Sequence, residues 1–206
     1  MPPPLRTLLA SLALVLAGAA AFATVTDGFR AFTTETARRI AVREHPVNIP
    51  AVALQAQSGA RIEFADFRGQ WLLVDFIYTR CPTICLALGG DFAQLQRLLA
   101  RPISQGKLRL LSISFDPAHD TPEQLAAYQQ RFGSHGSSWL AARPITAQGL
   151  ERLKRAFGIT VIPNAYGGYT HNTAIHILNP SEQLVEILDA GDAQRVAQDM
   201  RRRLSP

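Results

Sequence analysis

The sequence predicts an α/β domain with a central mixed sheet and helices on both of its faces. Two uninterrupted apolar runs, residues 71–77 and 107–115, are typical of buried central strands. Helical patterns follow both runs, and two further strands with a final helix close the chain. Because strands that alternate with helices bury a sheet between two helical layers, we expect helices on both faces.

Local signals mark the individual elements. Thr121 is a good N-cap, Pro122 suits the first helical position and Gln124 comes three residues after the cap, so a helix starts there. Gly158 ends another helix. In chain order we predict a hairpin of 51–57 and 61–64, strand 71–77, a helix from Pro82 to Leu99, strand 107–115, helix 121–132, strand 138–142, helix 147–157, loop 162–170, strands 173–178 and 183–188, and helix 192–204. This order matches the thioredoxin-like fold, with an N-terminal β-hairpin extension and one extra internal helix.

The overall composition is that of a folded protein. The 206 residues suit one domain with a leader, and the formal charge of +5 is mild. Part of the charge lies in Arg201, Arg202 and Arg203, where cations suit a last helical turn; contact with anionic lipid or an acidic partner is the alternative. No basic stripe alternates with aromatic residues, so we predict no nucleic-acid partner.

The N-terminal segment differs from the rest of the chain. Residues 7–26 carry no charge and are long enough to cross a membrane as a helix. The sequence 21–23 resembles a signal-peptide cleavage site, but the apolar stretch exceeds the usual h-region of about 7–15 residues, which favours an uncleaved anchor. Arg6 predicts a cytoplasmic N-terminus. We therefore predict an anchor or signal segment over 1–26, a tether over 27–50 and a domain over 51–206. The domain is expected in the periplasm, held at the bacterial inner membrane, or soluble there if the leader is cleaved.

The chain contains two cysteines, Cys81 and Cys85, separated by Pro82, Thr83 and Ile84. A disulfide that closes so short a loop stabilises little, so we interpret the pair as chemical rather than structural. The strand-to-helix turn places Cys81 at the positive end of a helix, where unpaired N–H groups favour thiolate over thiol. Metal binding and disulfide exchange both need that thiolate.

The spacing of the two cysteines suits both kinds of chemistry. On a regular helix, side chains four residues apart have Cβ atoms about 5–6 Å from each other, which suits two ligands of one metal ion. A disulfide needs about 3.5–4.5 Å, so it requires Cys81 to lie outside the regular helix. Pro82 at the first helical position predicts that location.

Two thiolates leave most metal sites incomplete, so a third ligand is expected among the five histidines. His45 lies in the tether, His135 in a surface turn and His176 inside a predicted strand, where a core role is expected. His119 follows the second central strand, at the sheet end of the cysteine turn. His171 precedes the third major strand, in a loop that faces the cysteine turn in a thioredoxin-like fold. Topology alone makes His171 the first candidate and His119 the second. Two thiolates with one imidazole suit Cu(I) and also hold Cu(II), whereas zinc prefers a fourth ligand.

These residues resemble the Sco/SenC family, copper proteins of cytochrome c oxidase assembly. The resemblance rests on D-F-I-Y-T-R-C-P-T-I-C at 75–85, on D-P-A-H-D-T-P at 116–122 and on His171, nine residues before Pro180. It implies that Cys81, Cys85 and His171 bind one copper ion per chain. Many members have Asp where this chain has Thr170, which leaves open what orients the His171 ring. Many have Arg where it has His119, which puts an extra ligand or proton acceptor near the site.

The resemblance implies two functions at one site. In the first, the protein is a copper metallochaperone that delivers copper to the CuA centre in subunit II of cytochrome c oxidase. In the second, it is an exported thiol–disulfide oxidoreductase with Cys81 and Cys85 as its redox pair. Further expected partners are an exported thioredoxin-like reductant, another copper donor protein and the membrane. A peroxidase shares the fold, but the second cysteine and the placed histidine argue against it; a copper or redox sensor is a minor alternative.

Overall fold

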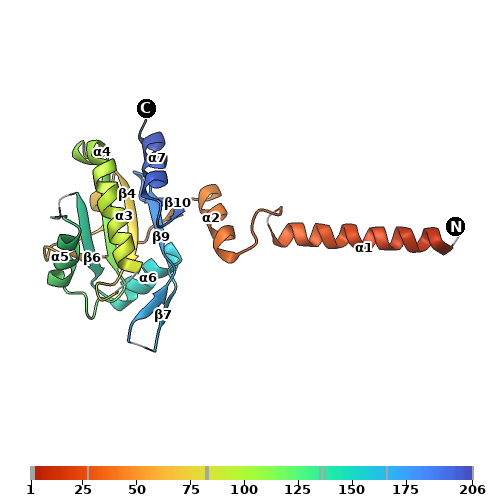
Figure 1. Cartoon of the computed structure of the whole chain (residues 1–206), viewed down its shortest axis with the longest axis horizontal. Helices are drawn as coiled ribbons and strands as arrows, with labels where there is room; N and C mark the ends of the chain where they lie inside the picture. The colour runs from red at the N-terminus through yellow and green to blue at the C-terminus, as the bar shows by residue number, and fades with distance from the viewer. Residues whose placement is uncertain are drawn as a thin grey trace. The chain divides into compact units, whose positions relative to one another are not determined.

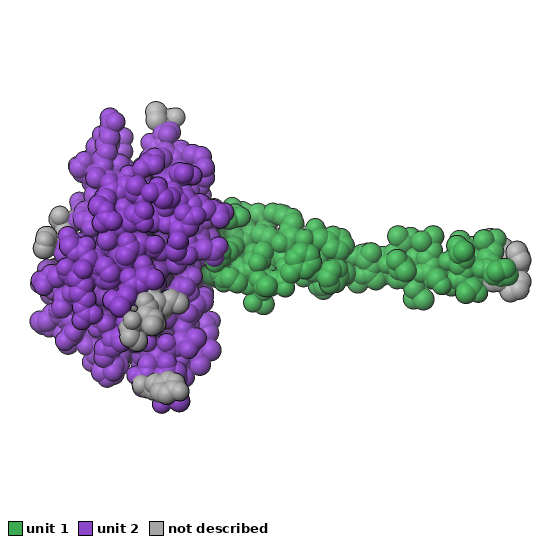
Figure 2. All heavy atoms as spheres, in the orientation of Figure 1, with its two compact units in different colours: residues 1–45 green, residues 46–206 purple. Residues whose placement is uncertain are grey.

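The computed structural model describes residues 3–26, 28–81, 84–134, 136, 138–165 and 167–205, without the side chains of residues 3, 84 and 85. The chain divides into two compact units, Met1–His45 and Pro46–Pro206 (Figure 2). The second unit contains every strand of the described residues, and both cysteines belong to it.

The first unit contains two helices, α1 (Pro3–Val25) and α2 (Thr34–Glu44). Within α1, the 22-residue segment Pro4–Val25 contains an 18-residue stretch with a mean hydropathy of 2.3, so the helix is long and apolar enough to cross a membrane; a signal sequence has the same properties. The segment 27–50, predicted as a tether with no helix or strand, contains the unpredicted helix α2. Thr33 caps this helix by accepting a hydrogen bond from the Thr36 amide, a signal that a window dominated by charged residues concealed.

The second unit is built on an eight-stranded mixed sheet with the order β1-β10-β9-β4-β5-β6-β2-β3 (Figure 1). The strands β4, β5 and β6 run parallel to one another, whereas β9 is antiparallel to β4. The bounds are β1 Val47–Asn48, β2 Leu54–Ala56, β3 Arg61–Ile62, β4 Trp71–Ile77, β5 Leu108–Ser114, β6 Trp139–Pro144, β9 Ala174–Leu178 and β10 Gln183–Asp189. The predicted central mixed sheet is confirmed, and the strands at 71–77 and 107–115 lie at its centre.

Helices cover both faces of this sheet, as the sequence predicts. Phe157 packs against Phe76 on one face, and Trp139 contacts Phe92 on the other. The helices are η1 Phe64–Phe67 (a 3₁₀ helix), α3 Ile84–Leu98, α4 Ala100–Ser104, α5 Pro122–Arg131, α6 Ala147–Phe157 and α7 Ala193–Leu204. Phe157 belongs to α6 and Phe92 to α3, so these two helices define the two layers.

Several short elements differ from the prediction. Helix α4 and strand β1 were not predicted, and the strand expected over 51–57 is limited to Leu54–Ala56. The second hairpin strand, expected over 61–64, ends at Ile62, because Phe64–Phe67 forms η1 with Glu63 and Asp66 as a reciprocal cap. The expected loop over 162–170 is a hairpin of β7 (Val161–Pro163) and β8 (Tyr169–His171). Strands of three residues are too short to show an alternating pattern, so the sequence gives no signal for them.

Candidate metal and redox site

Cys81 lies directly after β4, at the end of the sheet where that strand stops. Its amide donates to the Tyr78 carbonyl at 3.2 Å, and the residue is 5% exposed. Cys81 precedes α3, whose first turn contains Cys85. Cys81 therefore lies outside the regular helix, as a reversible disulfide requires. Pro82, expected at the first helical position, lies outside the described residues.

The backbone before Cys81 is held by a buried carboxylate that follows β5. Asp120 accepts a hydrogen bond from the Thr79 hydroxyl at 2.6 Å, from the Thr79 amide at 3.2 Å and from the Ser114 hydroxyl at 2.5 Å. Burial raises the pKa of Asp120, and the hydrogen bonds from Ser114 and Thr79 partly offset that rise. The loop after β5 thus fixes the residue two positions before the first cysteine.

Asp116, a second acidic residue in the same loop, contacts two half-exposed basic side chains. Arg80 Nη2 lies 2.9 Å from Asp116 Oδ2, and His119 Nδ1 lies 2.8 Å from Asp116 Oδ1. Burial raises the pKa of Asp116, but the hydrogen bonds from His119 and Arg80 outweigh it and hold that pKa below its ordinary value. The Nδ1 atom of His119 is therefore engaged by a carboxylate.

His171 ends β8 and is enclosed by aromatic rings. Its ring centroid lies 4.8 Å from that of Phe115 and 6.3 Å from that of Tyr78, and the residue is 9% exposed. Burial lowers the pKa of His171, and the hydrogen bond to the Asn172 carbonyl partly offsets this. Because Nδ1 donates to that carbonyl at 3.1 Å, the neutral ring carries its lone pair on Nε2. The Asn172 carbonyl is thus what orients the His171 ring in place of the acidic residue absent at Thr170.

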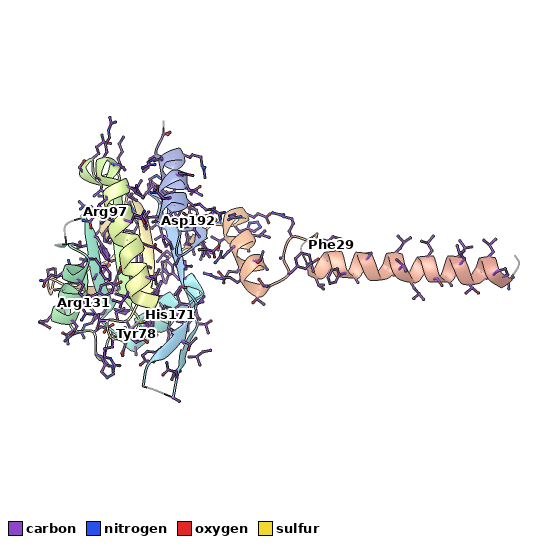
Figure 3. The ribbon with its side chains drawn as sticks, viewed as in Figure 1. Phe29, Tyr78, Arg97, Arg131, His171 and Asp192 are labelled. Atoms are coloured by element: carbon purple, nitrogen blue, oxygen red, sulfur yellow. The ribbon has the colours of Figure 1, made fainter. Side chains whose placement is uncertain are left out.

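Tyr78 joins the strand that leads to Cys81 to the hairpin that carries His171. Its hydroxyl donates to the Tyr169 carbonyl at 3.4 Å and accepts from the Tyr169 amide at 3.3 Å. A Cβ atom at position 168 would lie 3.1 Å from this hydroxyl, so Gly168 makes room for it. Figure 3 shows Tyr78 and His171 beside each other at one end of the domain. Tyr78 lies within the motif at 75–85, but its contact with Tyr169 spans 91 residues and has no local sequence signal.

Of the remaining histidines, His176 takes the core position expected of it. His176 is buried in β9 between Phe76 and Phe157, which is a core position. His45 is the C-terminal cap residue of α2 in the first unit. His135 lies outside the described residues.

No group of three or more His, Cys, Asp or Glu side chains lies close enough to hold a metal ion among the residues with described side chains, which exclude Cys85. The set Cys81, Cys85 and His171 therefore stays a prediction. Two of the predicted ligands, Cys81 and His171, lie on segments that Tyr78 connects: the chain after β4 and the β7–β8 hairpin.

Asp75 is a buried titratable group that the sequence analysis gave no role. It is 0% exposed in the middle of β4, and burial raises its pKa to about 7, an effect that the nearby Ser112 hydroxyl partly offsets. Neither carboxylate oxygen has a hydrogen-bond partner within the described part of the chain. Asp75 pairs in register with Ser112, which accepts from Trp139 on the face covered by α3. A single acid within an apolar strand was the available signal.

The fold and the cysteine turn define a thioredoxin-like protein, and solved structures share this arrangement. The chain superposes on the SCO1/SenC family lipoprotein from Bacillus anthracis with a TM-score of 0.67 at 22% identity, over 77% of this chain and 96% of that one. It superposes on yeast Sco1 with copper bound with a TM-score of 0.65 at 20% identity, over 77% and 89% of the two chains.

Sequence comparison identifies the family directly. The family model described as SCO1/SenC matches residues 43–205, so the chain belongs to the SCO1/SenC family. The SCO1 protein homolog of Bacillus subtilis is 25% identical over 146 residues, which cover 68% of this chain and 74% of that protein. The mitochondrial SCO2 homolog of Bos taurus is 29% identical over 211 residues, which cover 98% and 77% of the two chains.

Proposed function

We propose that this protein is a copper metallochaperone that binds one copper ion through Cys81, Cys85 and His171. One observation carries the proposal: Tyr78, which follows the strand leading to Cys81, ties the hairpin of a buried, neutral His171 to that strand. A neutral imidazole and thiolates are the forms that bind metal. Two soft thiolates with one imidazole suit copper, as Cu(I) or Cu(II).

Relatives with the same fold support copper as the cargo and cytochrome c oxidase as the destination. Copper-bound structures of yeast Sco1 and of Bradyrhizobium japonicum ScoI share the fold, and another similar structure belongs to "the Sco family of cytochrome c oxidase assembly proteins". We infer that the copper acceptor is the CuA domain of cytochrome c oxidase subunit II. A copper donor protein supplies the ion, an exported thioredoxin-like protein keeps the cysteines reduced, and α1 anchors the domain at the periplasmic face of the bacterial inner membrane.

A second role for the same cysteines, reduction of a partner's disulfide, is favoured by Asp75. Its carboxyl lies under α3, the helix that contains Cys85, and has a pKa of about 7, so it is suited to take up a thiol proton. In this reaction one thiolate attacks the partner disulfide and forms a mixed disulfide. The other thiolate then displaces the partner's sulfur, so Cys81 and Cys85 lose two electrons and two protons, and the partner dithiol gains them.

Copper titration of the reduced full chain in detergent tests the ligand set. Bound Cu(II) is expected to show thiolate-to-copper charge transfer in the visible region. Cys81→Ser and Cys85→Ser should abolish it, and His171→Ala should weaken binding sharply while His45→Ala has no effect. A wild-type spectrum in both cysteine variants would place the site elsewhere.

Redox gating tests whether copper needs both cysteines. A Cys81–Cys85 disulfide removes two of three ligands, so oxidised protein should retain no copper after desalting, and a dithiol reductant should restore loading. Equal copper stoichiometry in reduced and oxidised samples contradicts the proposed site.

A further inference from the structure

The second unit has a basic cleft at the end of the sheet opposite Cys81. Three exposed cations line it: Arg101 of α4, Lys107 just before β5 and Arg201 of α7. The cleft has a volume of about 380 Å³. In Figure 1, α4 and the C-terminal end of α7 lie at one end of the domain and the β7 hairpin lies at the other.

The three cations of this cleft have no acidic counterpart in the part of the chain that the structure describes. No Asp or Glu lines the cleft, and none of the ion pairs of the described residues includes Arg101, Lys107 or Arg201. Among the described residues, these guanidinium groups have one side-chain hydrogen bond to protein, from Arg201 Nη2 to the Leu98 carbonyl at 3.0 Å. Neighbouring arginines behave differently, since Arg203 is paired with Asp199 and Glu186. The cleft therefore has an excess of positive charge that suits an anionic group.

The register of the sheet places Val47, near the start of the second unit, at the end of the sheet that carries the basic cleft. Val47 of β1 pairs with Leu184, Leu184 pairs with Leu178, and Leu178 pairs with Leu72, the second residue of β4. Leu72 in turn pairs with Arg109, two residues after Lys107. The chain that arrives from the apolar helix α1 thus enters the sheet where β4 and β5 begin, which is the end that carries the basic cleft.

We propose that this cleft binds anionic phospholipid headgroups of the membrane in which α1 is embedded. The inference rests on the proposed anchoring of α1. Guanidinium groups match phosphate geometry, and basic residues held close to an anionic surface are attracted to it. The tether keeps the cleft near that surface, so binding is effectively intramolecular. Docked in this way, the domain holds Cys81 and His171 at its end distant from the membrane, accessible to an exported partner domain.

Hydrogen exchange of the full chain in nanodiscs tests this contact. Neutral phosphatidylcholine discs are compared with discs that also contain anionic phosphatidylglycerol. The anionic discs should slow amide exchange in segments 100–107 and 198–205 but not around Cys81, and high salt should reverse the effect. The variant Arg101→Gln/Lys107→Gln/Arg201→Gln should lose the slowing, because three charges near an anionic surface shift docking on the order of a hundredfold.

A matched variant controls for net charge. Arg131→Gln/Arg152→Gln/Arg155→Gln removes three exposed charges elsewhere and should keep the slowing. Equal exchange in both lipids, or equal loss in both variants, overturns the proposal. Equal slowing by inorganic phosphate in neutral discs also overturns it, since the cleft then binds a free anion. Chains that fail to remain in neutral discs refute the anchor instead, and copper stoichiometry, expected to be unchanged in both variants, reports separately on the metal site.

Discussion

The turn before Cys81 and the hairpin that carries His171 are held in different ways. A buried carboxylate holds the turn, because Asp120 accepts hydrogen bonds of 2.5–3.2 Å from Thr79 and Ser114. The hairpin is held by aromatic contacts and by two longer hydrogen bonds of 3.3 and 3.4 Å between Tyr78 and Tyr169. Hydrogen bonds to charged groups at short distance are roughly twice as strong as long neutral ones.

Within the proposed site, this difference indicates a fixed half, the turn Thr79–Cys81, and an adjustable half, the hairpin of β7 and β8. A carrier must bind its ion and then release it to a partner, so at least one ligand has to move away. The hairpin of His171 is the part with the weaker restraint, and we expect it to open while the cysteine turn keeps its shape. The predictions below change one restraint at a time, from the largest expected effect to the smallest.

Removal of the carboxylate should have the largest effect. Asp120→Leu leaves the Thr79 amide, the Thr79 hydroxyl and the Ser114 hydroxyl without their acceptor, and we expect the free energy of unfolding to fall by about 5 kcal/mol. Denaturant unfolding of the full chain measures this change. Asp120→Asn keeps one acceptor oxygen and serves as the milder control, with a smaller loss. A change below about 1 kcal/mol in both variants would contradict a carboxylate-held turn.

Asp75 tests how burial alone affects an acidic side chain in the strand that precedes the cysteine turn. Its folded-state pKa of about 7 exceeds the ordinary value of 3.8. Between these values the unfolded chain releases a proton that the folded chain keeps, so the stability of the wild type falls as pH rises from about 4 to 7 and is level above that. Asp75→Asn does not titrate. Relative to the wild type it should therefore gain about 4 kcal/mol between about pH 4 and pH 8. Denaturant unfolding across this range measures the gain, and a difference that is constant with pH argues against the raised pKa.

Loss of the Tyr78 hydroxyl should loosen only the adjustable half. Tyr78→Phe keeps the ring but removes both contacts to Tyr169, so we expect a loss of about 1 kcal/mol in stability. Copper release to a chelator should become about five- to tenfold faster, because the hairpin opens more readily. Stopped-flow measurement of release gives the rate. An unchanged rate with an unchanged copper spectrum would show that this hydroxyl does not restrain the hairpin.

His119→Ala should have the smallest effect. The His119 side chain is 52% exposed and its Nδ1 atom is hydrogen-bonded to Asp116, a contact worth about 0.5 kcal/mol. We expect unchanged copper stoichiometry and visible spectrum in the anaerobic titration. A loss of copper comparable to that of His171→Ala would add His119 to the ligand set.

Elements with a strong local sequence pattern were predictable from the sequence, and elements without one were not. The strand Trp71–Ile77, the helix Ala147–Phe157 and the caps Thr121 and Gly158 have the predicted bounds, because each has a strong local pattern. The β7–β8 hairpin and α2 were missed, because three-residue strands show no periodicity and the sequence of α2 is dominated by polar and charged residues.

The sequence by itself determined the cysteine motif, two cysteines four residues apart after a buried strand, and the family resemblance added His171 as the predicted third ligand. The cysteine motif is local in the chain, so composition and spacing report it. Only the tertiary structure decided which groups support the site. Asp120 reaches Thr79 across 41 residues and Tyr78 reaches Tyr169 across 91. Likewise, only the pairing of the strands shows that Val47 lies at the end of the sheet that carries the basic cleft. Contacts of this kind depend on how distant strands pair and pack, which no local pattern encodes.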